Sequence, residues 1–180
     1  MTTEPDIKLI NGFLEDPDHL FRELRFTVNW DERMRARKTA SFGVSYDYSG
    51  LTYPESPIPE YLQPVCDQIE STIGFAPNNC LLNYYPDGES SMGYHSDSSE
   101  ELLEGTGVAI VSLGSGRHIW FRSKADKEQQ YKYLLTSGSL LYMDQALQED
   151  WLHAIPKEPD VGERISMTFR HIIKNERASE

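Results

Sequence analysis

The chain has 180 residues, of which 38% are hydrophobic and 26% are charged, and its formal net charge is −12. This composition is typical of a folded globular protein, and no apolar run approaches the roughly 18 residues that a membrane-spanning helix needs. The acidic N-terminus is unlike a secretory signal, and Cys66 and Cys80 are too few for a disulfide framework. We expect one domain over residues 1–180 that is monomeric, needs no obligate protein partner and binds no membrane. We expect it in the cytoplasm, or in the nucleus of a eukaryote.

The basic residues are concentrated in two segments. No Lys or Arg occurs from Thr39 to Gly116, whereas residues 22–38 hold six bases against three acids and residues 117–132 hold five bases against two. The overall acidity opposes binding of a polyanion such as nucleic acid, but two basic segments around an acidic middle still permit it. Charge alone favours the simpler interpretation that both segments are solvated surfaces.

The N-terminal part of the chain predicts two helices. Asp16 or Asp18 can cap the first, and residues 59–74 predict the second, in which Pro64 marks the first turn or a kink. The apolar residues of the second helix recur every fourth position, at Tyr61, Val65, Ile69 and Ile73. Residues 39–58 are rich in Gly, Ser, Tyr and Pro, and predict a hairpin and loop outside the core.

After residue 79 the sequence changes to short apolar runs divided by turn residues such as Pro-Asp-Gly at 86–88. These runs predict strands over residues 80–85, 107–113, 118–122, 131–135, 139–143 and 165–173. Many short strands at this spacing favour a sandwich or jelly roll with helices on one side. The expected fold class is therefore α+β, with a β-rich core over about 79–175 and helices and a lid over about 15–78.

A short motif suggests a metal site. His95 and Asp97 are two positions apart, so in an extended segment their side chains point to the same face. His153 is the natural third ligand, since the intervening chain is long enough for several strands to return. Two histidines and one carboxylate form the facial triad of non-haem Fe(II) enzymes. The H-x-D motif is weak evidence by itself, because such triplets recur by chance.

The last predicted strand adds a second motif. Ile165, Met167 and Phe169 alternate with polar residues, so one face of the strand belongs to the core. The other face carries two guanidinium groups with hydroxyl groups between them, on Arg164, Ser166, Thr168 and Arg170. Arginine pairs with carboxylates through two parallel hydrogen bonds, so this face can bind a short dicarboxylate. Asn83 and Tyr85 form another same-face pair that is able to bind the same anion.

Together these motifs resemble the AlkB family of Fe(II)- and 2-oxoglutarate-dependent dioxygenases, over about residues 35–173. Further matching stretches are RKTASFG (37–43), YDYSG (46–50), SLGSGRHIWFR (112–122) and GSLLYM (138–143). The first two stretches look most like the branch of the family that repairs nucleic acids. The resemblance implies a double-stranded β-helix, or jelly-roll, core with a nucleotide-recognition lid.

The resemblance also implies cofactors and residue roles. Fe(II) would be bound by the predicted triad, with 2-oxoglutarate and O₂ as cosubstrates. Arg164, aided by Tyr85, would pair with the distal carboxylate of 2-oxoglutarate, and Asn83 and Arg170 would lie near its metal-chelating end. Ser166 replaces an Asn that is usual in the family, and its hydroxyl can still donate a hydrogen bond.

For the substrate, the resemblance implies methylated nucleic acid, either a single strand or a base flipped out of a duplex. Tyr46 and Tyr48 lie in the expected lid, where Tyr48 would stack on the target base, and Arg37 and Lys38 belong to the first basic segment. Repair members usually carry an acid two positions after the metal-binding Asp, where this chain has Ser99. We therefore expect weaker selection for a cationic base, and more activity after Ser99→Glu.

Two other functions fit the same motifs. The same oxidant can act on a protein side chain or a small metabolite, which the overall acidity favours. A metal-free jelly-roll binding module is a third possibility, but it leaves the two arginines of residues 164–170 without a purpose. Demethylation of nucleic acid differs from oxidation of a protein side chain or metabolite in one expectation: it requires the basic segments to converge on the mouth of the site.

Overall fold

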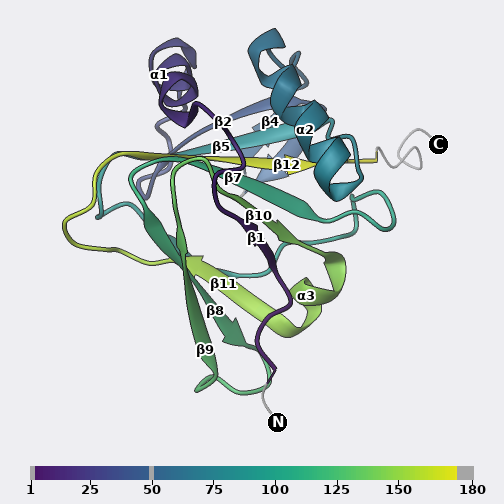
Figure 1. The fold of residues 1–180 in the computed structure, drawn as a ribbon, viewed down its shortest axis with the longest axis vertical. Helices are drawn as coiled ribbons and strands as arrows, with labels where there is room; N and C mark the ends of the chain where they lie inside the picture. Colours follow the sequence, from purple (N-terminus) through teal and green to yellow (C-terminus); the bar gives the residue numbers. More distant parts are fainter. Residues whose placement is uncertain (1–2, 49–50, 174–180) are drawn as a thin grey trace.

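The computed structural model describes residues 3–48 and 51–173, with only the backbone for Asp47 and Tyr48. Two antiparallel sheets face each other (Figure 1). The six-stranded sheet has the order β1 (Lys8–Ile10), β10 (Leu140–Met143), β7 (Val108–Gly114), β12 (Arg164–Arg170), β5 (Asn79–Tyr85) and β2 (Lys38–Gly43). The four-stranded sheet has the order β6 (Met92–His95), β11 (Trp151–Ile155), β8 (Arg117–Ser123) and β9 (Gln130–Leu135). A separate hairpin pairs β3 (Tyr46–Tyr48) with β4 (Leu51–Tyr53).

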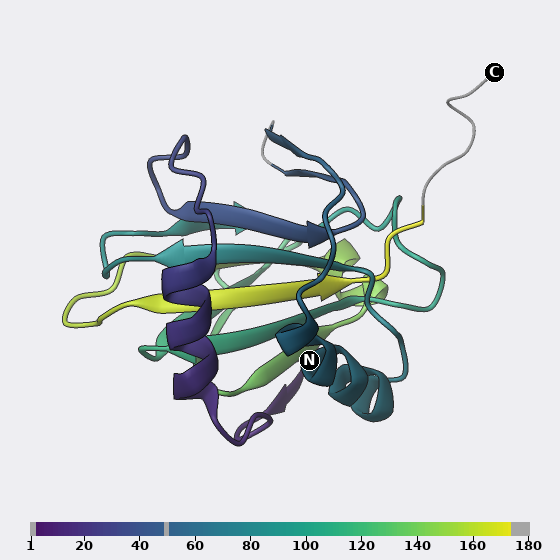
Figure 2. The same cartoon turned by 90° about the horizontal axis from the view of Figure 1, so that it is seen from above.

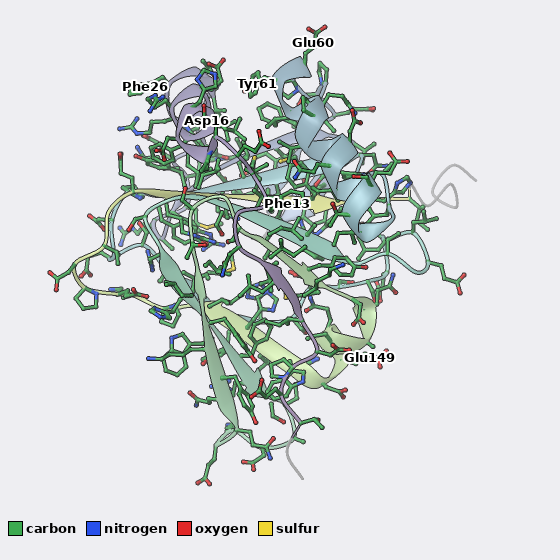
Figure 3. All side chains as sticks on the ribbon, in the orientation of Figure 1. Phe13, Asp16, Phe26, Glu60, Tyr61 and Glu149 are labelled. Carbon is green, nitrogen blue, oxygen red and sulfur yellow. The ribbon has the colours of Figure 1, made fainter. Side chains whose placement is uncertain are left out.

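Two helices cover the outer face of the six-stranded sheet (Figure 2). Helix α1 (Pro17–Thr27) begins at Asp16, whose carboxylate accepts the backbone N–H of His19. Helix α2 (Gln63–Ile73) follows the short 3₁₀ turn η1 (Glu60–Leu62). Both helices bury their apolar stripe against the sheet, and the side chains that do so include Leu24 of α1 and Val65 and Ile69 of α2. Phe26 lies on the outward side of α1 and is 76% exposed (Figure 3).

The alternation along β12 decides which side chains face the helices and which face the second sheet. Ile165, Met167 and Phe169 pack under the helices. Their polar neighbours line a cavity between the two sheets, which a second apolar cluster surrounds. Because β12 lies in the middle of its sheet, between β5 and β7, these polar side chains are buried on all sides.

The structure confirms the jelly-roll prediction and both N-terminal helices. Asp16 is the cap, and Pro64 lies in the first turn of α2 without kinking it. Each of the six predicted strands is present, and no end is shifted by more than three residues. Cys66 and Cys80 are both free and buried. In the part of the chain that the structure describes, no helix is long and apolar enough to cross a membrane.

Other parts of the prediction were wrong. Residues 38–43 form strand β2 at the edge of the main sheet, where Thr39 and Ala40 are buried, so only β3 and β4 form the expected hairpin. The sheet also takes in β1, so the core is not confined to residues 79–175. Strands β6 and β11 and helix α3 (Gln145–Asp150) were missed. Each of these elements is too short, at four to six residues, for its apolar pattern to stand out.

Candidate active site

The three predicted metal ligands meet at one end of the cavity. His95 is the last residue of β6 and lies opposite His153 on β11. Asp97 follows two residues later, beyond the end of the strand. One ligand atom from each residue lies within 4.8 Å of the other two. The carboxylate of Asp97 lies between the imidazoles, 3.5 Å from Nε2 of His95 and 3.6 Å from Nε2 of His153.

The surroundings of both histidines favour metal binding. Nδ1 of His95 lies 2.8 Å from the carbonyl oxygen of Gly93, to which it donates when the ring is neutral, so Nε2 carries the free lone pair. Burial lowers the pKa of His153 to about 4, which keeps this ring neutral near pH 7. Neutral imidazole is the form that binds a metal.

Asp97 provides the negative charge of the cluster. Burial by itself raises the pKa of Asp97, but His95, Arg170 and His153 outweigh burial and hold the pKa below its usual range. The guanidinium of Arg170 approaches to 3.6 Å from Oδ1. Asp97 is therefore an ionised, oxygen-donating ligand, and the three side chains together fit a divalent transition metal such as Fe(II).

The opposite end of the cavity is built around Arg164. Its side chain is only 1% exposed, and one terminal nitrogen donates to Oγ of Ser112 over 3.0 Å. The guanidinium stacks on the ring of Tyr85, whose other neighbour is the buried Arg117. Burial lowers the pKa of Arg164. Nε and Nη1 of Arg164 make no hydrogen bond within the described part of the chain.

The cavity extends between these two ends, from the metal ligands to Arg164. Polar side chains from β5 and β12 form one wall, and those at its centre are Asn83, Ser166 and Thr168. Apolar side chains complete the lining, and they include Ile110, Ile119, Leu135 and Ile155. Oδ1 of Asn83 accepts a 2.8 Å hydrogen bond from Nε of Arg37, so the NH₂ group of Asn83 is left to donate toward the cavity.

The lining fits 2-oxoglutarate. Arg170 also has two nitrogens, Nε and Nη1, without a hydrogen-bond partner among the described residues. A buried guanidinium with unpaired nitrogens costs free energy, which a bound carboxylate offsets. A dicarboxylate with one end at Arg164 and the other at the metal supplies negative charge to both arginines. The five cosubstrate residues predicted from the sequence, Asn83, Tyr85, Arg164, Ser166 and Arg170, all line this cavity.

The predicted substrate residues are more scattered. Tyr46 stacks on Arg170 at 4.7 Å and, with Arg37, lines a second, open depression in front of His95 and Asp97. Arg37 is 7% exposed and is bonded to Asn83, so it is a cavity residue rather than a surface cation.

The other predicted substrate residues lie outside this depression or cannot be placed. Lys38 lies beside Tyr84 on the helix-covered face and pairs with Glu32. Ser99 is not in the depression, whereas its neighbour Ser98 is. The side chain of Tyr48 lies outside the described residues.

Some site residues escaped the sequence analysis. Ser112 and Arg117 lie in a stretch that matched the family but received no role, and Gln148 of α3 accepts the backbone N–H of Asp97. Ser112 faces Ser166 across neighbouring strands, so only the strand order reveals it. The residues around Gln148 give no signal in the sequence.

Comparisons with known proteins agree with this geometry. The sequence model of the 2OG-Fe(II) oxygenase superfamily matches residues 14–170. DNA oxidative demethylase ALKBH2 from Bos taurus is 33% identical over 88% of this chain, and the Homo sapiens protein of that name is 32% identical over the same share. Alpha-ketoglutarate-dependent dioxygenase alkB homolog 3 from Rattus norvegicus is 32% identical over 95% of this chain.

The chain spans 65% of the bovine and rat relatives and 69% of the human one. The solved structure of OsALKBH1 superimposes with a TM-score of 0.68 over 95% of this chain and all of that one, at 20% identity. This likeness supports the fold. The matched model and the sequence relatives, in agreement with the His-Asp-His cluster, show that the chain belongs to the 2OG-Fe(II) oxygenase superfamily and, within it, to the AlkB family.

Proposed function

We propose that this chain uses Fe(II), 2-oxoglutarate and O₂ to remove alkyl groups from nitrogen atoms of bases in DNA or RNA. The relatives named DNA oxidative demethylase support this reaction class. The observation that carries the proposal is the surface beside the open depression in front of His95, where aromatic rings and cations alternate.

The chemistry divides between cofactor and protein. Fe(II), which His95, Asp97 and His153 would hold, would supply the oxidation of an N-methyl carbon by O₂, with 2-oxoglutarate converted to succinate and CO₂. The hydroxylated N-methyl group then breaks down to formaldehyde and the unmodified base. Arg164 and Ser112 orient the distal carboxylate of 2-oxoglutarate, and the apolar lining keeps water from it. His95, with its side chain 32% exposed, marks the side from which a base can approach.

The outer face of the four-stranded sheet suits a polynucleotide. Tyr94, next to His95, lines the depression, and Arg122 stacks on its ring at 4.2 Å. On the neighbouring strands Lys132 lies 5.5 Å from the ring of Trp120. Cations bind phosphates, and aromatic rings stack on bases of any sequence. The basic segment 117–132 therefore contributes Arg122 and Lys132 to a face that begins at the mouth of the site.

The first basic segment contributes less to this face. Met34 and Arg37 line the depression, but Arg33 pairs with Asp31, and Lys38 lies on the opposite face. Convergence of the two segments is thus partial. Together with the net charge of −12, this keeps the oxidation of a protein side chain or metabolite as the second candidate.

The proposal is tested with a methylated single-stranded oligonucleotide and the matching methylated nucleoside. Arg122→Ala should weaken oligonucleotide binding and lower the slope of log K against log salt by about one, because one phosphate contact is lost. Formaldehyde release from the nucleoside should be unchanged. Lys8→Ala, which removes an exposed lysine from the distant strand β1, is the matched control and should leave both values as in the parent. If the parent chain releases no formaldehyde from either substrate but forms succinate with a peptide or metabolite, the second candidate is correct.

A further inference from the structure

The backbone of Asp97 lies where strand pairing has ended. Strand β6 pairs with β11 through His95 and His153, and residues 96–99 belong to no strand or helix. The N–H group of Asp97 therefore has no partner in the sheet. The carboxylate of the same residue contacts both histidines and Arg170, so a small shift of this backbone moves the only acidic ligand of the cluster.

A side chain from α3 takes the place of the missing strand partner. Oε1 of Gln148 accepts the N–H of Asp97 over 2.9 Å. Gln148 is 6% exposed, so water does not compete easily for this bond. Its NH₂ group lies 3.8 Å from Sδ of Met143, which is a weak acceptor. The strong hydrogen bond of this side chain is the one to Asp97.

Gln148 is itself held in place. The short helix α3 is capped by Asp144, whose carboxylate accepts the N–H of Leu147. At the other end, Nζ of Lys124 donates to the backbone carbonyl of Gln148 over 2.7 Å. The next residue, Glu149, is exposed and points away from the sheets (Figure 3). The orientation of α3 thus directs Gln148, and not its neighbour, toward the metal end of the cavity.

We propose that Gln148 is a positioning residue of the iron site, fixing Asp97 relative to His153 through its hydrogen bond to the Asp97 N–H. Gln148 precedes His153 by five residues on the same stretch of chain. The bond therefore ties the segment that carries one ligand to the segment that carries another. Groups that orient ligands in this way control metal affinity. The inference rests on the iron site alone and is independent of the substrate under Proposed function.

The chain offers a matched control on the same helix. Gln145 also bonds a loop through its side chain, donating to the backbone carbonyls of Leu103 and Thr106 over 3.2 and 2.6 Å. Neither of these two hydrogen bonds involves a metal ligand. Gln145→Met and Gln148→Met each remove the hydrogen bonds of one glutamine from α3 with little change in side-chain volume. A merely structural role for Gln148 predicts the same behaviour from both variants.

The first experiment titrates cobalt(II), followed by its visible absorption, into the metal-free parent and variants. Gln148→Met should weaken cobalt binding about tenfold, because outer contacts of metal ligands have effects of this size. Gln145→Met should bind cobalt as the parent does. Gln148→Glu keeps an acceptor for the Asp97 N–H and should recover part of the lost affinity. Parent-like cobalt binding by folded Gln148→Met, or equal losses in Gln148→Met and Gln148→Glu, would overturn the proposal.

One further measurement needs no variant and so covers a variant that fails to fold, and a second adds an activity readout for a folded one. In the parent chain, the amide hydrogen of Asp97 should exchange with solvent more slowly than that of the exposed Ser98, although neither lies in a strand. Equal exchange rates would contradict the hydrogen bond. In succinate formation without nucleic acid, Gln148→Met should raise the half-saturating Fe(II) concentration by the same factor as its loss of cobalt affinity. The KM for 2-oxoglutarate should not change, since Arg164 binds that molecule.

Discussion

The two ends of the cavity satisfy their charges in different ways. At the metal end, Asp97 contacts His95, His153 and Arg170, so positive and negative groups already compensate one another. At the cosubstrate end, Arg164 is also buried, but among the described residues no carboxylate pairs with its guanidinium, which bonds a hydroxyl group and stacks on an aromatic ring. The contacts at the metal end contribute to the stability of the fold, whereas the cosubstrate end carries a positive charge that a bound anion would compensate. Activity and stability should therefore respond differently to mutation at the two ends.

The largest effect is expected at Asp97. Asp97→Asn removes the acidic ligand and leaves Arg170 without its carboxylate, so iron-dependent turnover of 2-oxoglutarate should be abolished and the Tm should fall. His95→Ala and His153→Ala should abolish turnover as well. Succinate formation and thermal unfolding of the metal-free variants measure the two effects. Turnover in any two of the three variants would contradict the triad.

The next effect separates binding from stability. Arg164→Met removes the buried partner of the distal carboxylate and should raise the KM for 2-oxoglutarate at least about 30-fold. The metal-free protein should be as stable as the parent or more so, because no protein carboxylate loses a partner. Substrate-saturation curves and thermal unfolding test both statements. A variant whose KM for 2-oxoglutarate equals that of the parent, or whose Tm lies well below that of the parent, would show that the two ends do not differ in this way.

A neighbouring arginine sharpens the comparison. Arg117 flanks the other side of Tyr85, but its guanidinium donates to the carbonyls of Asp87, Ser90 and Pro156. Arg117→Met should lower the free energy of unfolding by about 3 kcal/mol, because three part-buried carbonyls lose a charged donor. The KM for 2-oxoglutarate should rise much less than in Arg164→Met. Chemical denaturation and saturation kinetics together distinguish the two arginines. Equal changes in stability and in KM for the two variants would contradict the assignment of Arg117 to the fold and of Arg164 to cosubstrate binding.

The smallest effect concerns the open depression. A carboxylate there should favour a cationic methylated base by up to about fivefold, the range of an exposed ion pair. Because Ser98 and not Ser99 lines the depression, Ser98→Glu should change selectivity more than Ser99→Glu. Formaldehyde yields from a cationic and a neutral methylated base measure the ratio. A larger change in Ser99→Glu would favour the assignment made from the sequence.

The sequence predicted the cavity face of β12 and the ligand set because both follow from local spacing. Alternation along residues 164–170 requires no knowledge of the neighbours of the strand. Ser112 and Gln148 could not be found in this way, since their roles depend on strand order and on the placement of α3. Arg37 illustrates the opposite error. It belongs to a run of bases that is typical of a surface segment, but it immediately precedes β2 and its side chain reaches Asn83 inside the sheet.

The central claim is that this cavity couples oxidation of 2-oxoglutarate to demethylation of a base. The direct measurement is the ratio of formaldehyde to succinate formed with Fe(II), O₂ and a methylated single-stranded oligonucleotide, for the parent and for Arg164→Met. The account predicts equimolar products for the parent and loss of both together in the variant at low 2-oxoglutarate. Succinate formation that the oligonucleotide does not increase, with no formaldehyde, would contradict it.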